Sequence, residues 1–532
     1  MTLGSQRHGS DFYTPISFYT PIPSNPVASA ALDAWLVWAE AMNSDVHPTA
    51  LSALLERHWT PDDTESAFGL VNVKSGLSAP LSGAHSNPLS HGASALGRCI
   101  FWGLVHQGMP DTAAEKAYWD ASIDHDKEGV WIPVATAYAL AALTPGDDAK
   151  RFVDAFVYAL PRQSRLRGAI PLIVRSVAEP DGARKLHGML ADSLGVADPL
   201  SSVLAGACVI YALTASGGSF ESCVCETAAF GGASIHSTMA CGAAAALLAG
   251  DVPSRWTDPI EQKFSCGTSL RGLSLPKGLN GLIEVVASLA PSPHVEVVPS
   301  GESTEHATVA PTQLPLVPLP LDVAQEPNFM ALSYNGASVL VYYHSSPTFA
   351  PAETTNLSIS FVNTSGAPLD FAPRLTPPPG WECAHKVTSF TLLTGASATF
   401  PVVLRCKSPE LIDYVLEVEI AGETRTIPLL SPQRWYRVGP LLNQEGTGFD
   451  REYPAQRNIA LGAYFNGRSD MPVEWRETLE RTCQFDVESL MAGGPGTAYY
   501  FARVRFPAPG RFGLRAGEVL TWRQRTTTRR VA

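Results

Sequence analysis

The spacing of apolar residues changes once along this 532-residue chain, and the change separates two kinds of fold. From about Val27 to Ala290, apolar residues recur every three or four positions in Ala-rich segments such as "RFVDAFVYAL". That spacing places them on one side of a helix. Beyond residue 324, apolar and polar residues alternate in short runs such as "TNLSISFVN", the pattern of half-buried strands. The sequence therefore predicts a multidomain protein, with an all-α bundle followed by all-β domains.

A Pro-rich stretch lies between the two patterns. "SGESTEHATVAPTQLPLVPLPLDVA" has no apolar period, and its composition is typical of a linker. We therefore divide the chain into an extended N-terminal arm (1–26), an α-helical domain (27–299), a linker (300–324), a β-sandwich (325–432) and a β jelly-roll-like domain (433–532). The arm contains "FYTPI" twice, which is too few copies for a solenoid.

Charge and cysteine content exclude several classes of protein. The formal net charge is -12, and no basic stripe is present that could neutralise a phosphate backbone, so we expect no nucleic-acid partner. No window of 18 uncharged apolar residues exists, so we expect no membrane span. Most of the nine cysteines lie in apolar stretches, which favours buried thiols in a cytoplasmic protein. No feature of the sequence predicts the oligomeric state.

The stretch "GGASIHSTMACGAAAALLAG" (231–250) has the pattern of a glycine loop that leads into a tightly packed helix. Ser237 is the expected N-cap, and Gly250 ends the helix. A glycine loop before a helix N-terminus is a common place for an anion or a metal. This loop, however, contains no carboxylate.

Several short motifs of the helical part follow one another in a recognisable order. The stretch 87–129 has an Asn-Pro, a Gly-Arg, a Gly-x-Pro, and an Asp followed by a His and a Gly; these are Asn87, Pro88, Gly97, Arg98, Gly108, Pro110, Asp120, His125 and Gly129. Further on come "YALPRQSRL" and "LLAGDVPSRWTDPI". In this order the motifs resemble those of the ADP-ribosylglycohydrolase (crystallin J1-like) family. The resemblance covers about residues 30–260 and implies that family's helical fold.

The family's metal-binding motif is altered in this chain. Members carry a Gly-x-Asp-Thr-Asp loop before an Ala/Gly-rich helix, and its aspartates hold two Mg²⁺ ions. The resemblance puts Ala233 and Ile235 at the two aspartate positions. "PDDTE" (61–65) imitates the family's other acidic cluster, but it comes later in the chain than expected, and an exposed helix start is the alternative. Mg²⁺ requires hard oxygen ligands, so we expect no metal and no cofactor.

The resemblance also selects the residues of a candidate pocket. We assign catalytic roles to four of them: His236, Ser237, Asp120 and His125. The residues expected to bind substrate are Ser234, Thr238, Asn87, His91, Trp131, Ala233 and Ile235. Alternatives remain for three positions: His125 as a surface loop residue, Asp120 as the anchor of a turn, and Trp131 as a core residue. Ser237 and His236 do not form a nucleophile pair, because neighbouring side chains on a helix point apart.

Three functions are compatible with a pocket that has lost its metal. The first is a cofactor-free enzyme of specialised metabolism that orients an apolar small-molecule substrate, such as a cyclase or a hetero-Diels–Alder pericyclase. The second is a catalytically inactive protein that binds ADP-ribose or a glycan, and the third is a metal-dependent glycohydrolase.

The C-terminal region resembles a galactose-binding-like jelly roll in two segments, "GPLLNQEGTGFDREYP" and "AYFNGRSDMPVEW". This region has no cluster of aromatic side chains for a sugar ring to stack on beyond Trp475 and Tyr464. The sequence therefore favours a structural packing role for this domain over sugar binding.

Overall fold

The fold is known from a computed structural model of the chain. It describes residues 26–60, 64–144, 146–193, 200–231, 234–261, 267, 270–290, 328–407, 410–441, 453–457, 461–468, 471–481, 490 and 496–502. The arm and the linker expected from the sequence lie outside these residues, apart from Pro26. The domain boundaries given above therefore stay predictions.

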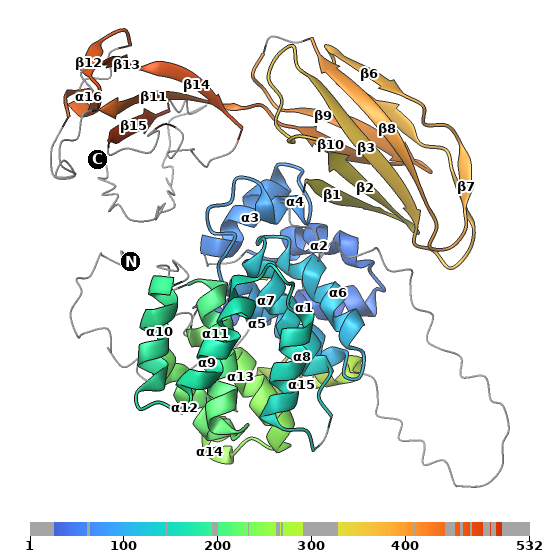
Figure 1. The fold of residues 1–532 in the computed structure, drawn as a ribbon. Helices are drawn as coiled ribbons and strands as arrows, with labels where there is room; N and C mark the ends of the chain where they lie inside the picture. The colour runs from blue at the N-terminus through green and yellow to red at the C-terminus, as the bar shows by residue number, and fades with distance from the viewer. Residues whose placement is uncertain are drawn as a thin grey trace.

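The N-terminal half is a helical bundle, as the sequence predicted (Figure 1). The helices are α1 (Pro26–Asn43), η2 (Pro48–Ala50), α2 (Leu51–His58), α3 (Thr64–Lys74), α4 (Leu81–Ala84), α5 (Ser94–Val105), α6 (Pro110–Ala121), α7 (Glu128–Ala141), α8 (Ala149–Ala159), α9 (Arg165–Ser176), α10 (Gly182–Ser193), α11 (Ser202–Ser216), α12 (Phe220–Phe230), α13 (Ser234–Ala249), α14 (Ser254–Glu261) and α15 (Gly278–Leu289). Helices α5, α7 and α11 are buried along nearly their whole length, because they are apolar on every side. Among the described helices, none is both long and apolar enough to cross a membrane.

The chain then forms antiparallel sheets, which confirms the predicted all-β half. A five-stranded sheet has the order β1-β2-β3-β8-β6, a three-stranded sheet the order β10-β9-β5, and β4 pairs with β7. Their bounds are β1 (Phe329–Tyr334), β2 (Ala337–Tyr343), β3 (Thr354–Asn363), β4 (Leu369–Phe371), β5 (Arg374–Thr376), β6 (Trp381–His385), β7 (Phe390–Leu392), β8 (Ser397–Cys406), β9 (Tyr414–Ile420) and β10 (Glu423–Leu429). Inward side chains of these strands form one shared core around Phe361 and Tyr343.

A smaller strand unit follows. Strands β11 (Gln433–Leu441), β14 (Arg476–Glu480) and β15 (Thr497–Phe501) form one sheet; β12 (Tyr464–Asn466) pairs with β13 (Pro472–Glu474), and α16 (Pro454–Arg457) lies beside them. Trp475 is buried in the core of this unit, whereas Tyr464 is exposed. The two rings therefore differ in access to solvent. The jelly-roll resemblance stays a prediction.

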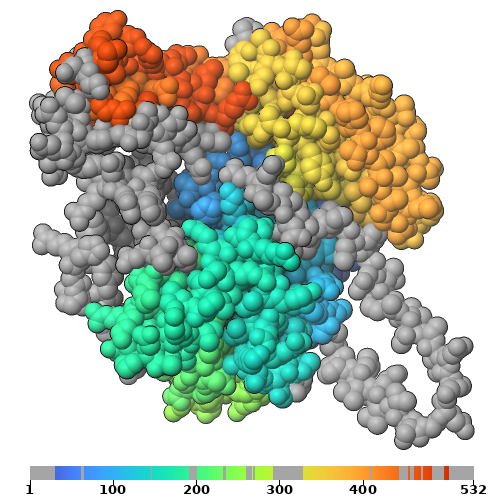
Figure 2. All heavy atoms as spheres, viewed as in Figure 1, coloured from blue at the N-terminus to red at the C-terminus, as the bar shows by residue number. Residues whose placement is uncertain are grey.

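The first sheet packs directly against the helical domain (Figures 1 and 2). The backbone of Ala331 in β1 donates to the Ala79 carbonyl at 3.1 Å, and a buried hydrogen bond of 3.0 Å joins the hydroxyls of Thr49 and Ser338. Phe329, Ala331, Leu340 and Val362 share one apolar core with helices α1, α2, α5 and α6. This contact combines backbone pairing with apolar burial, so the two halves form one packed body.

This interface predicts the outcome of cutting the linker. A protease site inserted between residues 311 and 320 should give two fragments that still elute together in size-exclusion chromatography, because the shared core is untouched. Ala331→Asp would place a carboxylate in that core, where an unpaired charge is costly, and should release the fragments. Two separately eluting soluble fragments from the otherwise unchanged chain would show that the interface is too weak to hold them.

Candidate functional site

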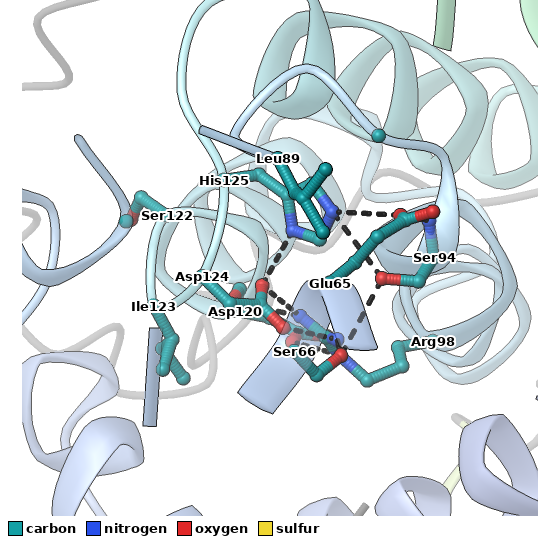
Figure 3. A network of polar contacts seen from close by, with 12 residues as sticks. Glu65, Ser66, Leu89, Ser94, Arg98, Asp120, Ser122, Ile123, Asp124 and His125 are labelled. Carbon is teal, nitrogen blue, oxygen red and sulfur yellow. Dashed lines mark hydrogen bonds and ion pairs between the residues drawn. The ribbon is translucent and has the colours of Figure 1, made fainter. Parts of the chain in front are cut away.

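A buried cluster of charged side chains connects α3, α5, α6 and the loop before α7 (Figure 3). Arg98, on α5, is at its centre. Its Nε donates to Asp120 Oδ1 at 3.0 Å, and Nη1 and Nη2 donate to the two carboxylate oxygens of Asp124 at 2.7 and 2.6 Å. The remaining N–H groups reach Ser66 Oγ and the Asp120 carbonyl. All five guanidinium donors therefore have acceptors within the protein.

His125 extends this cluster towards α3 and the start of α5. Its Nδ1 lies 2.6 Å from Asp124 Oδ1, and its Nε2 lies 3.2 Å from Ser94 Oγ and 3.4 Å from Glu65 Oε2. The same Glu65 oxygen accepts from the Ser94 backbone N–H at 2.9 Å. Burial alone would lower the pKa of His125, but Asp124 and Glu65 outweigh it and raise that pKa to about 9.

The cations Arg98 and His125 change the pKa values of the neighbouring carboxyl groups. Burial would raise the pKa values of Glu65 and Asp124, yet His125 lowers that of Glu65, and Arg98 with His125 lowers that of Asp124. Burial dominates at Asp120, where it raises the pKa despite the contact with Arg98. At neutral pH Arg98 and His125 are thus both charged, and Glu65 and Asp124 are both ionised.

Three glycines let the backbone approach this cluster closely. A Cβ at Gly83 would lie 2.2 Å from the His125 carbonyl oxygen, one at Gly69 2.4 Å from Asp124 Cα, and one at Gly129 2.2 Å from the Ser90 carbonyl oxygen. Asn87 adds a fixed polar bridge, because its amide donates to the backbone carbonyls of Gly83 and Asp124. The loop that carries Asp124 and His125 is therefore fixed by α3, α4 and the segment around Asn87.

A small hollow lies beside this cluster, lined by Ala30, Ala31, Trp59, Ser66, Ser94, Arg98 and His236. It contains about 180 Å³ of empty space, part of it open to solvent, but the centre of a water molecule can occupy only about 10 Å³. That is room for about one water molecule. His236 is 6% exposed, and its Nδ1 has no hydrogen-bond partner among the described residues. Burial lowers the pKa of His236 to about 4, so its ring is neutral at pH 7.

The structure brings some of the predicted site residues together and separates others. His236 lines the hollow, and Asp120 and His125 belong to the adjacent charged cluster. His125 is fully buried, so the alternative of a surface loop residue is wrong. Asp120 is fully buried as well, where it accepts from Arg98 and from the Trp102 indole N–H at 3.1 Å.

Other predicted site residues are engaged in packing or in hydrogen bonds within the fold. Ser237 is not the N-cap, because α13 begins at Ser234; its hydroxyl instead donates to the Ala205 carbonyl of α11 at 3.3 Å. His91 is exposed, Asn87 bridges backbone carbonyls, and Trp131 is half-buried against the apolar cores. Ile235 and Thr238 are half-buried on α13. Ala233 and the side chain of Ser234 lie outside the described residues.

The sequence reasoning missed the contribution of α3 and of the start of α5. Glu65 and Ser66 occupy the first turn of α3, and Ser94 is the first residue of α5. Glu65 is the last residue of "PDDTE", and it accepts a hydrogen bond from the Ser94 backbone N–H, beside the hollow that Ser94 lines. Asp62, Asp63 and the Thr64 side chain lie outside the described residues. The motif was the signal that could have identified this part of the site.

The described residues do not fit a pair of Mg²⁺ ions. Within the part of the chain that the structure describes, no group of three or more His, Cys, Asp or Glu side chains could hold a metal ion. The carboxylates nearest the hollow, those of Glu65, Asp120 and Asp124, accept hydrogen bonds from protein donors. Mg²⁺ would have to displace those donors to gain oxygen ligands.

The sequence profile of the ADP-ribosylglycohydrolase family matches residues 22–287, which is half of the chain. The chain belongs to this family. The matched segment coincides with the described helices α1–α15, apart from the last two residues of α15 and the stretches outside the described residues. A search of curated proteins found no match. Family membership accounts for the helical fold; what the site does is a separate question.

Proposed function

We propose that the helical domain binds an ADP-ribosyl group, or a closely related nucleotide sugar, over the starts of α3, α5 and α13 without metal-assisted cleavage. Two facts support the choice of ligand class. The domain belongs to the ADP-ribosylglycohydrolase family, and the hollow lies where the first turns of α3 and α13 meet. The ligand binds there while its bulk remains outside the hollow, since little more than a hydroxyl group can enter.

The observation that carries the proposal is the state of His236. A buried polar atom without a partner costs free energy, so such atoms in folded proteins are few and call for an explanation. His236 Nδ1 is such an atom among the described residues, and the His236 side chain belongs to the lining of the hollow. A hydroxyl group of a bound sugar satisfies it, as donor or acceptor according to the tautomer of the ring.

The size and polarity of the hollow give no support to a cycloaddition enzyme. Such an enzyme must surround two apolar partners with walls that fix their relative orientation. The hollow has room for about one water molecule, and five of its seven lining residues carry polar side-chain groups. This hollow therefore leaves no room for an apolar small-molecule substrate to react inside it.

The absence of metal-assisted cleavage is inferred from the sequence and from hydrogen bonding. Ala233 and Ile235 occupy the positions of the family's aspartates, and neither side chain can bind Mg²⁺. The nearby described carboxylates are engaged with Arg98, His125 and the Ser94 N–H. A bound ADP-ribosyl group would therefore remain intact.

Thermal unfolding in the presence of ADP-ribose tests the proposal. At 100 times its Kd a ligand stabilises the folded state by about 2.7 kcal/mol, which should raise the Tm of the helical domain by roughly 5–10 °C. His236→Ala should remove most of this shift. His106→Ala is the matched control, because His106 is also buried with an unpartnered Nδ1 among the described residues but does not line the hollow.

Metal dependence separates the proposal from its alternatives. The shift should be the same in EDTA and in excess Mg²⁺, and chromatography should recover all ADP-ribosyl compound unchanged. A shift that requires Mg²⁺, or cleavage of an ADP-ribosylated peptide, would establish the metal-dependent glycohydrolase instead. No shift at any ADP-ribose concentration would refute this ligand class.

A further inference from the structure

We propose that Ser94 is a nucleophile for short-chain acyl esters, with His125 as its general base and Asp124 as the residue that positions His125. The three side chains form a continuous hydrogen-bonded chain: Ser94 Oγ to His125 Nε2 at 3.2 Å, and His125 Nδ1 to Asp124 Oδ1 at 2.6 Å (Figure 3). A hydroxyl, an imidazole and an orienting carboxylate in this order are the arrangement that activates serine in hydrolases of unrelated fold.

Access and rigidity favour the same assignment. Ser94 lines the hollow beside this chain of residues, so a small molecule that enters the hollow comes next to Ser94. Asp124 is held by two hydrogen bonds from Arg98, which fixes the carboxylate that orients His125. The chain is thus built on a helix start and a fixed loop, both of which restrict the reacting atoms to one geometry.

A group that stabilises the developing negative charge is also available. Acyl transfer places charge on the former carbonyl oxygen, and a neutral imidazole N–H can donate to it. His236 lines the same hollow, is neutral at pH 7 and has no described partner for Nδ1. The tautomer with its proton on Nδ1 would donate to that oxygen.

The charges around His125 set the pH at which this chemistry operates. Titratable and charged groups come from every element packed near it: Glu65 from α3, Arg98 from α5, Asp120 from α6, Asp124 next to it, His236 from α13 and His91 from the loop before α5. Asp124 and Glu65 keep His125 protonated at pH 7, so it cannot accept the Ser94 proton there. The two carboxylates therefore suppress the nucleophile at neutral pH, and reactivity rises as the pH approaches 9.

The reaction balances without a cofactor. Ser94 Oγ bonds to the ester carbonyl carbon while its proton passes to His125. The ester C–O bond breaks, and the leaving alcohol takes the proton from His125. Water then cleaves the acyl-serine by the reverse roles, which releases the carboxylic acid and restores the hydroxyl. The hollow has room for about one water molecule, so only the carbonyl oxygen of a short acyl group enters it and the rest of the ester stays outside.

Covalent labelling of the full chain by methanesulfonyl fluoride tests this proposal. The reagent is small; Ser94 Oγ would bond to its sulfur, fluoride would leave, and His125 would take the proton. Mass spectrometry of peptides should locate one methanesulfonyl group on Ser94. Because the free base of His125 is the reactive form, the labelling rate should rise about 50-fold from pH 7 to pH 9.

Three variants make the test specific. Ser94→Ala should abolish the label, and Ser176→Ala should retain it, because the buried Ser176 hydroxyl donates to the Leu172 carbonyl of α9 and does not line the hollow. Glu65→Gln removes a carboxylate that stabilises the His125 cation, so the midpoint of labelling should move to lower pH. Circular dichroism checks that each variant is folded, and peptide mapping of the unaltered chain does not depend on any variant.

Several results would overturn the proposal: no label at pH 9, a label on another residue, a rate independent of pH, or an unchanged midpoint in Glu65→Gln. None of them bears on ADP-ribose binding, which is measured separately and requires no reaction at Ser94. Slow release of acetate from p-nitrophenyl acetate, lost in Ser94→Ala, would extend the result from labelling to turnover.

Discussion

Replacing Arg98 by methionine should destabilise the helical domain by roughly 3–5 kcal/mol, enough to unfold a domain of ordinary stability. Arg98 is 1% exposed and is the partner of two buried carboxyl groups, those of Asp120 and Asp124. Methionine fills a similar volume but leaves these carboxyl groups without their cation. The cost arises because a buried charge has lost its partner, not because a cavity has formed.

Urea unfolding of the variant and of a matched control measures this effect. Arg425→Met removes an arginine whose ion pair with Glu423, at 2.9 Å, is exposed on the β half, and it should change stability by less than about 1 kcal/mol. The loss of unfolding free energy in Arg98→Met should also become smaller as the pH is lowered, because protonation neutralises the carboxylates that have lost Arg98 as their partner. Equal stabilities for the two variants would mean that the buried cluster does not hold the domain together.

The two fold classes could be predicted because each depends on local spacing. The helices and strands repeat apolar residues at the periods of their own structure, as "RFVDAFVYAL" does in α8 and "TNLSISFVN" does in β3. The start of α13 was less predictable. Ser237 has the residue type of an N-cap, yet the helix begins three residues earlier, because a serine can also satisfy a buried carbonyl of a neighbouring helix.

The site was only partly predictable because its residues meet through tertiary packing. Glu65, Ser94 and His125 come from three separate stretches of chain, and no spacing rule relates them. His125 and Asp120 were found through the family resemblance, but the burial of His125 depends on glycines that admit a neighbouring backbone. Such close approaches are visible only when the elements are placed in three dimensions.

Replacing Gly69 by alanine should therefore disturb the charged cluster although it touches no charged atom. Gly69 lies within α3, and a Cβ there would stand 2.4 Å from Asp124 Cα and 2.7 Å from the Ile123 carbonyl oxygen. Both neighbours are backbone atoms of a fixed loop, so the helix or the loop must move. The cost of overpacking, up to about 3 kcal/mol, exceeds the gain of up to about 1 kcal/mol from removing a glycine inside a helix.

Gly168→Ala provides the matched control, because Gly168 is also inside a helix, α9, but a Cβ there meets no atom within 4 Å. That variant should gain about 0.5–1 kcal/mol and raise the Tm by roughly 1–4 °C, whereas Gly69→Ala should lower it by roughly 4–8 °C. Hydrogen exchange shows which part of the domain is disturbed. The His125 amide donates to the Ala121 carbonyl at 3.0 Å, and it should exchange faster in Gly69→Ala but not in Gly168→Ala. A stabilised Gly69→Ala would mean that α3 lies farther from Asp124, and that Glu65 is not held against His125.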